Sequence, residues 1–121
     1  MQITQKNFYK KLLGRAGELK AEEFLKKKGF KILKTNYKTH CGEIDIIALD
    51  GECLVFVEVK TRSSEEFGLP SEAVTIKKQE KYFKVALEFL QREKKLDSQC
   101  RFDVIEIENG QINHIIDAFC M

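Results

Sequence analysis

The chain has 121 residues, of which 43% are hydrophobic and 33% are charged. This composition predicts one soluble globular domain over residues 1–121 with a single core, and it excludes a disordered or fibrous chain. No stretch approaches the roughly eighteen apolar residues of a membrane-spanning helix, so no membrane partner is expected. The formal net charge of +2 neither requires nor excludes a nucleic-acid partner.

The cysteines and the N-terminal segment predict a cytoplasmic protein. The cysteines show no CxxC motif and no paired zinc spacing, and free thiols suit a reducing compartment. The basic N-terminal segment lacks the apolar core of a signal peptide. A zinc site combining His40, Cys41, His114 and Cys120 is disfavoured, because their spacing matches no familiar ligand pattern.

In chain order, the first predicted element is a helix over residues 15–28. Gly29 ends it, and three lysines near its end suit the negative end of the helix dipole. Residues 1–13 are predicted to be an N-terminal extension, in which residues 4–13 form a further helical turn or two. These turns are separate from the helix over 15–28, because Gly14 and Gly17 weaken the helix at the junction.

The rest of the chain alternates between strand and helix patterns, which gives the order αβββαββ. Asp50-Gly51 and Asn109-Gly110 are two-residue hairpin signals. The predicted segments are a strand over 30–37, a hairpin over 42–62, a loop over 63–71, an amphipathic helix over 77–95, and strands over 101–107 and 111–119.

The hairpin GEIDIIALDGECLVFVEVKTR separates its side chains into two faces. With Asp50-Gly51 as the loop, paired positions sum to 101, so Asp45 faces Phe56 and Glu43 faces Glu58. Because strand side chains alternate, Glu43, Asp45, Glu58 and Lys60 project to one side. The other face is apolar throughout: Ile44, Ile46, Ala48, Cys53, Val55, Val57 and Val59.

The charged face predicts a metal site. Glu43 opposite Glu58 is repulsive, and Asp45 lies diagonally from Glu58 at roughly 7 Å. A hard cation such as Mg²⁺ or Mn²⁺, bound by Asp45 and Glu58, removes the repulsion, and Lys60 steadies negative charge beside it. The alternative is a solvated strand face. The apolar run 54–59 disfavours it, because the run is typical of a buried central strand.

Asp45 followed thirteen residues later by Glu58-Val59-Lys60 resembles the PD-(D/E)xK nuclease superfamily. Further motifs over residues 14–119 resemble the YraN family of small bacterial proteins, similar to archaeal Holliday-junction resolvases. These motifs are Gly14-Arg15-Ala16-Gly17-Glu18, Ala21, Gly29, Asn36-Tyr37, Gly42-Glu43-Ile44-Asp45, Phe56-Val57-Glu58-Val59-Lys60, Arg62, Phe67-Gly68, Glu72-Ala73-Val74, Lys78-Gln79, Arg101-Phe102-Asp103-Val104, His114 and Ala118-Phe119.

The resemblance implies an α/β restriction-endonuclease-like fold of three layers, an αβββαβ core whose mixed central sheet is flanked by helices. It also implies that Glu18 is a third metal carboxylate. A helical wheel agrees, since Glu18 lies nearer the apolar arc than Glu22 or Glu23. Gln79 matches a glutamine that related nucleases place near the site. Related nucleases have a tyrosine four residues after this glutamine. Here Phe83 occupies that position, and Tyr82 comes one residue earlier.

Other polar residues have structural or binding interpretations. Asp103 is expected to anchor the sheet as a buried polar group, and His114 to be a satisfied core histidine. Glu43 either shapes the field of the site or pairs with Arg62 or Lys60. The basic residues that follow the hairpin predict phosphate contacts, with solvated side chains as the alternative for each. They are Arg62, Lys77, Lys78, Lys81 and Lys84.

Two functions fit these observations. The first is a metal-dependent endonuclease with Asp45, Glu58, Lys60, Glu18 and Gln79 in its site and Mg²⁺ or Mn²⁺ as cofactor. The resemblance implies DNA, branched or structured, as its substrate, and a homodimer suits two cuts on a two-fold junction. The second is a nucleic-acid-binding or assembly module in DNA uptake or repair that keeps the fold without turnover.

Overall fold

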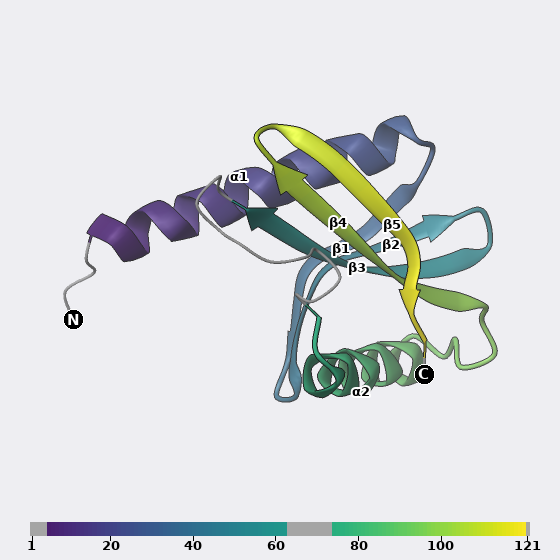
Figure 1. The fold of residues 1–121 in the computed structure, drawn as a ribbon. Helices are drawn as coiled ribbons and strands as arrows, with labels where there is room; N and C mark the ends of the chain where they lie inside the picture. Colours follow the sequence, from purple (N-terminus) through teal and green to yellow (C-terminus); the bar gives the residue numbers. More distant parts are fainter. Residues whose placement is uncertain (1–4, 63–73, 121) are drawn as a thin grey trace.

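The computed structural model describes residues 5–62 and 74–120, and it confirms the αβββαββ order (Figure 1). The loop predicted over 63–71 lies outside the described residues. The elements are α1 (Gln5–Lys27), β1 (Lys31–Thr39), β2 (Gly42–Asp50), β3 (Cys53–Arg62), α2 (Ile76–Arg92), β4 (Cys100–Glu108) and β5 (Gln111–Phe119).

A five-stranded sheet lies between the two helices and gives the molecule three layers (Figure 1). The strand order is β1-β2-β3-β4-β5, with β3 and β4 parallel and the other neighbours antiparallel. α2 makes the parallel pair possible, because parallel neighbours need a crossover connection. Ala21 and Leu25 of α1 pack on one face, and Val85 and Phe89 of α2 pack on the other. The predicted restriction-endonuclease-like fold is confirmed.

The β2–β3 hairpin forms, but its loop is Gly51-Glu52 and the predicted register is wrong by two residues. Asp50 pairs with Cys53, so paired positions sum to 103. Gly51 has a φ of 61° at the first loop position, where a type II′ turn has its glycine. The predicted pairs of Asp45 with Phe56 and of Glu43 with Glu58 therefore do not occur. A shift of two keeps side chains on their faces, since a strand has a period of two.

The predicted alternation on β2 is wrong at Glu43 and Ile44, since Glu43 lies toward α1 and Ile44 toward α2. Ile44 packs with Val85 and Phe89 on the α2 side, whereas Ile46 packs with Leu25 on the α1 side. Opposite this stretch, β1 carries Asn36 with a φ of 51° between the paired positions Thr35 and Tyr37. Such irregularities in one strand re-aim the side chains of its neighbour.

The predicted break in the first helix is wrong, because α1 is continuous through both glycines. A glycine inside a helix costs about 1 kcal/mol relative to alanine. At Gly17 the reason for glycine is tertiary, since a Cβ there would overlap the Thr61 side chain of β3. Close packing of α1 on the sheet therefore decides this position.

The second helix ends at Arg92 rather than at the predicted residue 95. Lys94 adopts a left-handed φ of 56°, and the N–H of Lys95 donates to the carbonyl of Leu90 at 2.7 Å. This is the geometry of a helix C-terminal cap, which glycine usually supplies. Because Lys94 occupies the position where glycine is usual, the sequence does not predict that the helix ends here.

Asp103 of β4 is the buried anchor that the sequence predicted. It is 0% exposed, and its carboxylate accepts from Arg101 Nε and Nη2, His114 Nε2 and the N–H of Asp117. Burial alone would raise the pKa of Asp103, but the hydrogen bonds from His114, Arg101 and Asp117 hold it below its usual value. His114 is thereby confirmed as a satisfied core histidine, packed edge-on against Phe24 and Phe30.

Asp103→Asn is expected to lower the free energy of unfolding by roughly 3 kcal/mol, because it breaks the ion pair of a fully buried carboxylate with Arg101. The depressed pKa gives stability that is present at neutral pH and lost as the pH falls through acidic values. Urea titrations of wild type and variant at several pH values test this. The exposed Asp97→Asn is the control, and equal midpoints for the two variants would contradict the anchoring role.

Candidate active site

The Asp45 carboxylate lies where β2 and β3 separate. The paired residues of the two strands run from Asp50 and Cys53 as far as Ile46 and Val57. Beyond them, the N–H of Val59 donates to Asp45 Oδ2 at 2.8 Å. Asp45 thus takes the place of a β2 backbone acceptor, and it lines a cavity on the α1 side of the sheet.

Glu58 and Lys60 lie beside Asp45 on β3. The Glu58 carboxylate is within hydrogen-bonding reach of Asp45, and Lys60 Nζ lies 3.3 Å from Glu58 Oε1. Tyr82 of α2 lines a cavity with Glu58, and burial together with the nearby Glu58 carboxylate raises the pKa of Tyr82 well above its usual range. The structure therefore brings together Asp45, Glu58 and Lys60 as the sequence predicted.

Glu18 and Glu43 reach the site from the side of α1. With its amide nitrogen turned to the carboxylates, Asn36 donates to Glu43 Oε1 at 3.1 Å and to Glu18 Oε2 at 3.0 Å. Burial and the charge of Glu43 raise the pKa of Glu18. Glu18 and Asp45 line one cavity of about 90 Å³. Asn36 is thus the contact that the structure gives Glu43, where the sequence suggested Arg62 or Lys60.

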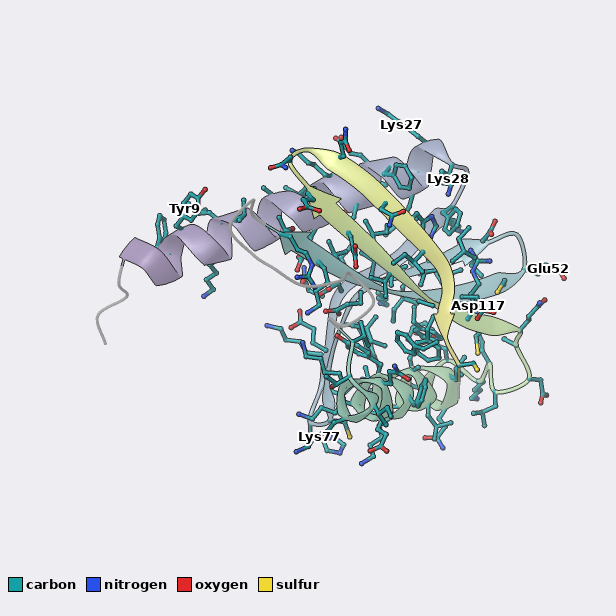
Figure 2. All side chains as sticks on the ribbon, in the orientation of Figure 1. Tyr9, Lys27, Lys28, Glu52, Lys77 and Asp117 are labelled. Carbon is teal, nitrogen blue, oxygen red and sulfur yellow. The ribbon has the colours of Figure 1, made fainter. Side chains whose placement is uncertain are left out.

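Lys78 is the basic residue of α2 that reaches the site. Hydrogen bonding with Lys60 and burial lower the pKa of Lys78, while the pKa of Lys60 is raised, against its burial, by Lys78 and Glu58. Lys77 is exposed at the start of α2 (Figure 2), and Arg62 lies at the end of β3 next to Glu106.

Gln79 lies in the first turn of α2 and is half-buried. Its Nε2 donates to the carbonyl of Val74 at 3.1 Å, which ties the helix to the residue that precedes its N-cap. Gln79 therefore has a structural contact, and its proposed role in the site stays a prediction.

Sequence reasoning missed Asn36 and Tyr82 as parts of the site. Asn36-Tyr37 was noticed only as a family motif, although asparagine tolerates the positive φ that the position requires. The spacing of Tyr82, three residues after Gln79 instead of four, does not predict a place in the site. Its contact with Glu58 depends on how α2 crosses the sheet, which the sequence does not specify.

The zinc set considered from the sequence does not assemble. His114 is occupied by Asp103 and by Lys28, whose Nζ lies 2.9 Å from its Nδ1. His40 and Cys41 instead meet Glu88 of α2, with one ligand atom from each within 4.8 Å of the others.

The carboxylates of the site repel one another when all are ionised. Burial and the charge of Glu58 raise the pKa of Asp45 to about 8, although the Val59 N–H acts to lower it. Glu18 and Glu43 add negative charge on the same side. Carboxylate oxygens are the donors that Mg²⁺ and Mn²⁺ prefer, so this set fits a hard divalent cation.

Comparison with known sequences identifies the family. Residues 17–107 match the sequence model described as uncharacterised protein family UPF0102. The chain belongs to this family, which is the YraN family suggested by the motifs. A UPF0102 protein of Caldicellulosiruptor saccharolyticus is 50% identical over 108 residues, covering 89% of this chain and 92% of the relative. Another, of Caldanaerobacter subterraneus subsp. tengcongensis, is 46% identical over 121 residues, covering 94% and 99%.

A third UPF0102 protein, of Geotalea daltonii, is 51% identical over 114 residues and covers 90% of each chain. The relatives therefore match this chain over nearly its whole length. In the part of the chain that the structure describes, neither helix is long and apolar enough to cross a membrane.

Asp45→Asn is expected to stabilise the metal-free UPF0102 protein at pH 8. A folded-state pKa near 8 means that native Asp45 binds a proton that the unfolded chain releases near pH 4. The unfolding free energy of the wild type therefore falls between pH 4 and pH 8, and asparagine removes this loss. We expect a gain of about 1–3 kcal/mol at pH 8 that shrinks toward pH 4.

Thermal melting in chelator at several pH values measures this gain, with the exposed Glu52→Gln as the control. A melting temperature of Asp45→Asn at or below that of the wild type at pH 8 would show that the carboxylate is not crowded.

Proposed function

We propose that this UPF0102 protein is a metal-dependent nuclease that hydrolyses phosphodiester bonds in DNA. The observation that carries the proposal is the half-buried Asp45 carboxylate, fixed by the Val59 N–H against Glu58 and with its pKa raised to about 8. Perturbed groups of this kind cluster at functional sites. The ion pair of Lys60 with Glu58 adds a cation at the same place.

Asp45, Glu58 and Glu18 are the residues proposed to hold Mg²⁺ or Mn²⁺. Their oxygens meet the donor preference of either ion. When bound, such an ion supplies Lewis acidity toward the phosphoryl group and lowers the pKa of a water. The raised pKa values of Asp45 and Glu18 support the assignment, because a cation would relieve the repulsion that raises them.

The chain's own residues supply charge and orientation. Lys60 keeps its proton and would stabilise the negative charge that develops on a phosphate oxygen. Asn36 donates to Glu18, and Tyr82 lies beside Glu58, so each carboxylate has a polar neighbour from another element. Gln79, in the first turn of α2 next to Lys78, is proposed to be a further residue of the catalytic site.

DNA is the proposed substrate, with Arg62, Lys77 and Lys78 as phosphate contacts. These residues flank the site on β3 and on the first turn of α2. The similarity to resolvases supports branched or structured DNA and a homodimer that makes two cuts. So small a domain has little surface for reading bases, so recognition would depend on shape and backbone.

Cleavage of labelled linear, single-stranded, flap and four-way DNA with Mn²⁺ tests the proposal. We expect Asp45→Asn to abolish cleavage and to lose the stabilisation that Mn²⁺ gives the wild type, about 2.7 kcal/mol at 100 times the dissociation constant. Lys60→Ala should cut cleavage at least 10²-fold, roughly the cost of one charge-stabilising donor, with DNA affinity kept.

The exposed Lys95→Ala, beyond the end of α2, is the control for Lys60→Ala. DNA binding without cleavage of any substrate would favour the non-catalytic binding module instead. A Mn²⁺ response that persists in Asp45→Asn would place the ion elsewhere.

Glu18→Gln is expected to reduce cleavage with little loss of stability, because glutamine keeps the volume and still accepts from Asn36. Glu23→Gln is the matched control, since Glu23 is exposed on the same helix. Glu22 lines the cavity with Asp45 and pairs with Lys26 at 3.3 Å, so Glu22→Gln should have an intermediate effect. Equal activity of Glu18→Gln and Glu23→Gln would remove Glu18 from the site.

A further inference from the structure

The first half of α1 forms one wall of a groove that leads to the carboxylates. The groove has a volume of about 600 Å³. A second cavity continues it to Asp45, and the two share Arg15, Glu18 and Asn36. From Phe8 to Glu18 the helix rises about 15 Å, at about 1.5 Å per residue.

The groove wall combines apolar and basic side chains. Phe8 and Leu12 are 56% and 52% exposed although both are large and apolar. Lys11 and Arg15 stand on the same helix face, since positions three, four and seven apart align. Lys38 of β1 lies across from them, so three cations border the groove.

We propose that this groove binds an unpaired nucleic-acid strand and guides it to the site. That the strand is guided to the site rests on the proposed function, whereas binding of the strand rests on the groove residues alone. Exposed aromatic rings next to lysine and arginine are the pattern by which proteins hold single strands, with bases stacked on the rings and phosphates on the cations.

A single strand fits these features better than a duplex. An aromatic ring such as Phe8 can stack only on a base whose face is free, and duplex bases have both faces stacked. At the rise of about 3.4 Å per nucleotide of a stacked strand in duplex DNA, 15 Å spans about four nucleotides, and a more extended unpaired strand would place fewer there. The substrate class would then be DNA with a single-stranded arm, such as a flap.

Tyr9 and Lys20 provide matched controls on the same helix. Tyr9 is 65% exposed on the projecting turns of α1 and does not line the groove (Figure 2). Lys20 is exposed and stands nine residues from Lys11, which is about 180° around the helix.

Fluorescence anisotropy with a labelled twenty-nucleotide oligothymidine and with a blunt duplex, both in chelator, tests the groove. We expect tighter binding of the single strand and a loss of about fivefold or more for Phe8→Ala, as for one stacked base. Lys11→Gln and Arg15→Gln should each lower the slope of log affinity against log salt by about 0.7. Tyr9→Ala and Lys20→Gln should match the wild type.

Equal losses for Phe8→Ala and Tyr9→Ala, or no preference for the single strand, would overturn the proposal. A change from dimer to monomer in Phe8→Ala, seen by sedimentation, would assign the face to a second copy of the chain and would also overturn it. Cleavage assays separate the two proposals. If the protein binds the single strand but cleaves no substrate, the groove proposal stands and the nuclease proposal fails. If Phe8→Ala leaves both single-strand binding and cleavage unchanged, the nuclease proposal stands and the groove proposal fails.

Discussion

The hydrogen bond from the Val59 N–H to Asp45 is the interaction on which the site depends. It closes the open end of the β2–β3 ladder with a carboxylate instead of a carbonyl. A buried N–H without an acceptor is costly, so the strands can separate here only because Asp45 satisfies this one. The same bond fixes a charge against Glu58, and the fold thereby maintains a repulsion that a cation could relieve.

The separation of the strands also explains how both helical layers contribute to one site. α1 lies on one face of the sheet and α2 on the other, and a continuous sheet would keep their side chains apart. Glu18 approaches Asp45 from the α1 side, and Tyr82 approaches Glu58 from the α2 side. The groove beside Phe8 opens on the α1 side, so a strand bound there would meet Glu18 before Glu58.

The surroundings of Asp103 and Asp45 shift the pKa values of these two aspartates in opposite directions. Asp103 has hydrogen bonds from Arg101, His114 and the backbone, and its pKa is lowered. Asp45 has one N–H and a like-charged neighbour, and its pKa is raised to about 8. A satisfied buried charge stabilises its own geometry, whereas an unsatisfied one is typical of a site that binds something. The contrast distinguishes a structural carboxylate from a functional one in the same sheet.

The sequence by itself determined the element order, the two faces of the hairpin between Ile46 and Val57, and the grouping of Asp45, Glu58 and Lys60. These follow from hydrophobic periodicity and from the alternation of strand side chains, which survive an error of two residues in register. Only the tertiary structure decided the continuous α1, the roles of Asn36 and Tyr82, and the new position of Ile44. These depend on close packing at Gly17, on an irregular β1 and on the crossing of α2, which arise between elements and leave no periodic signal in the chain.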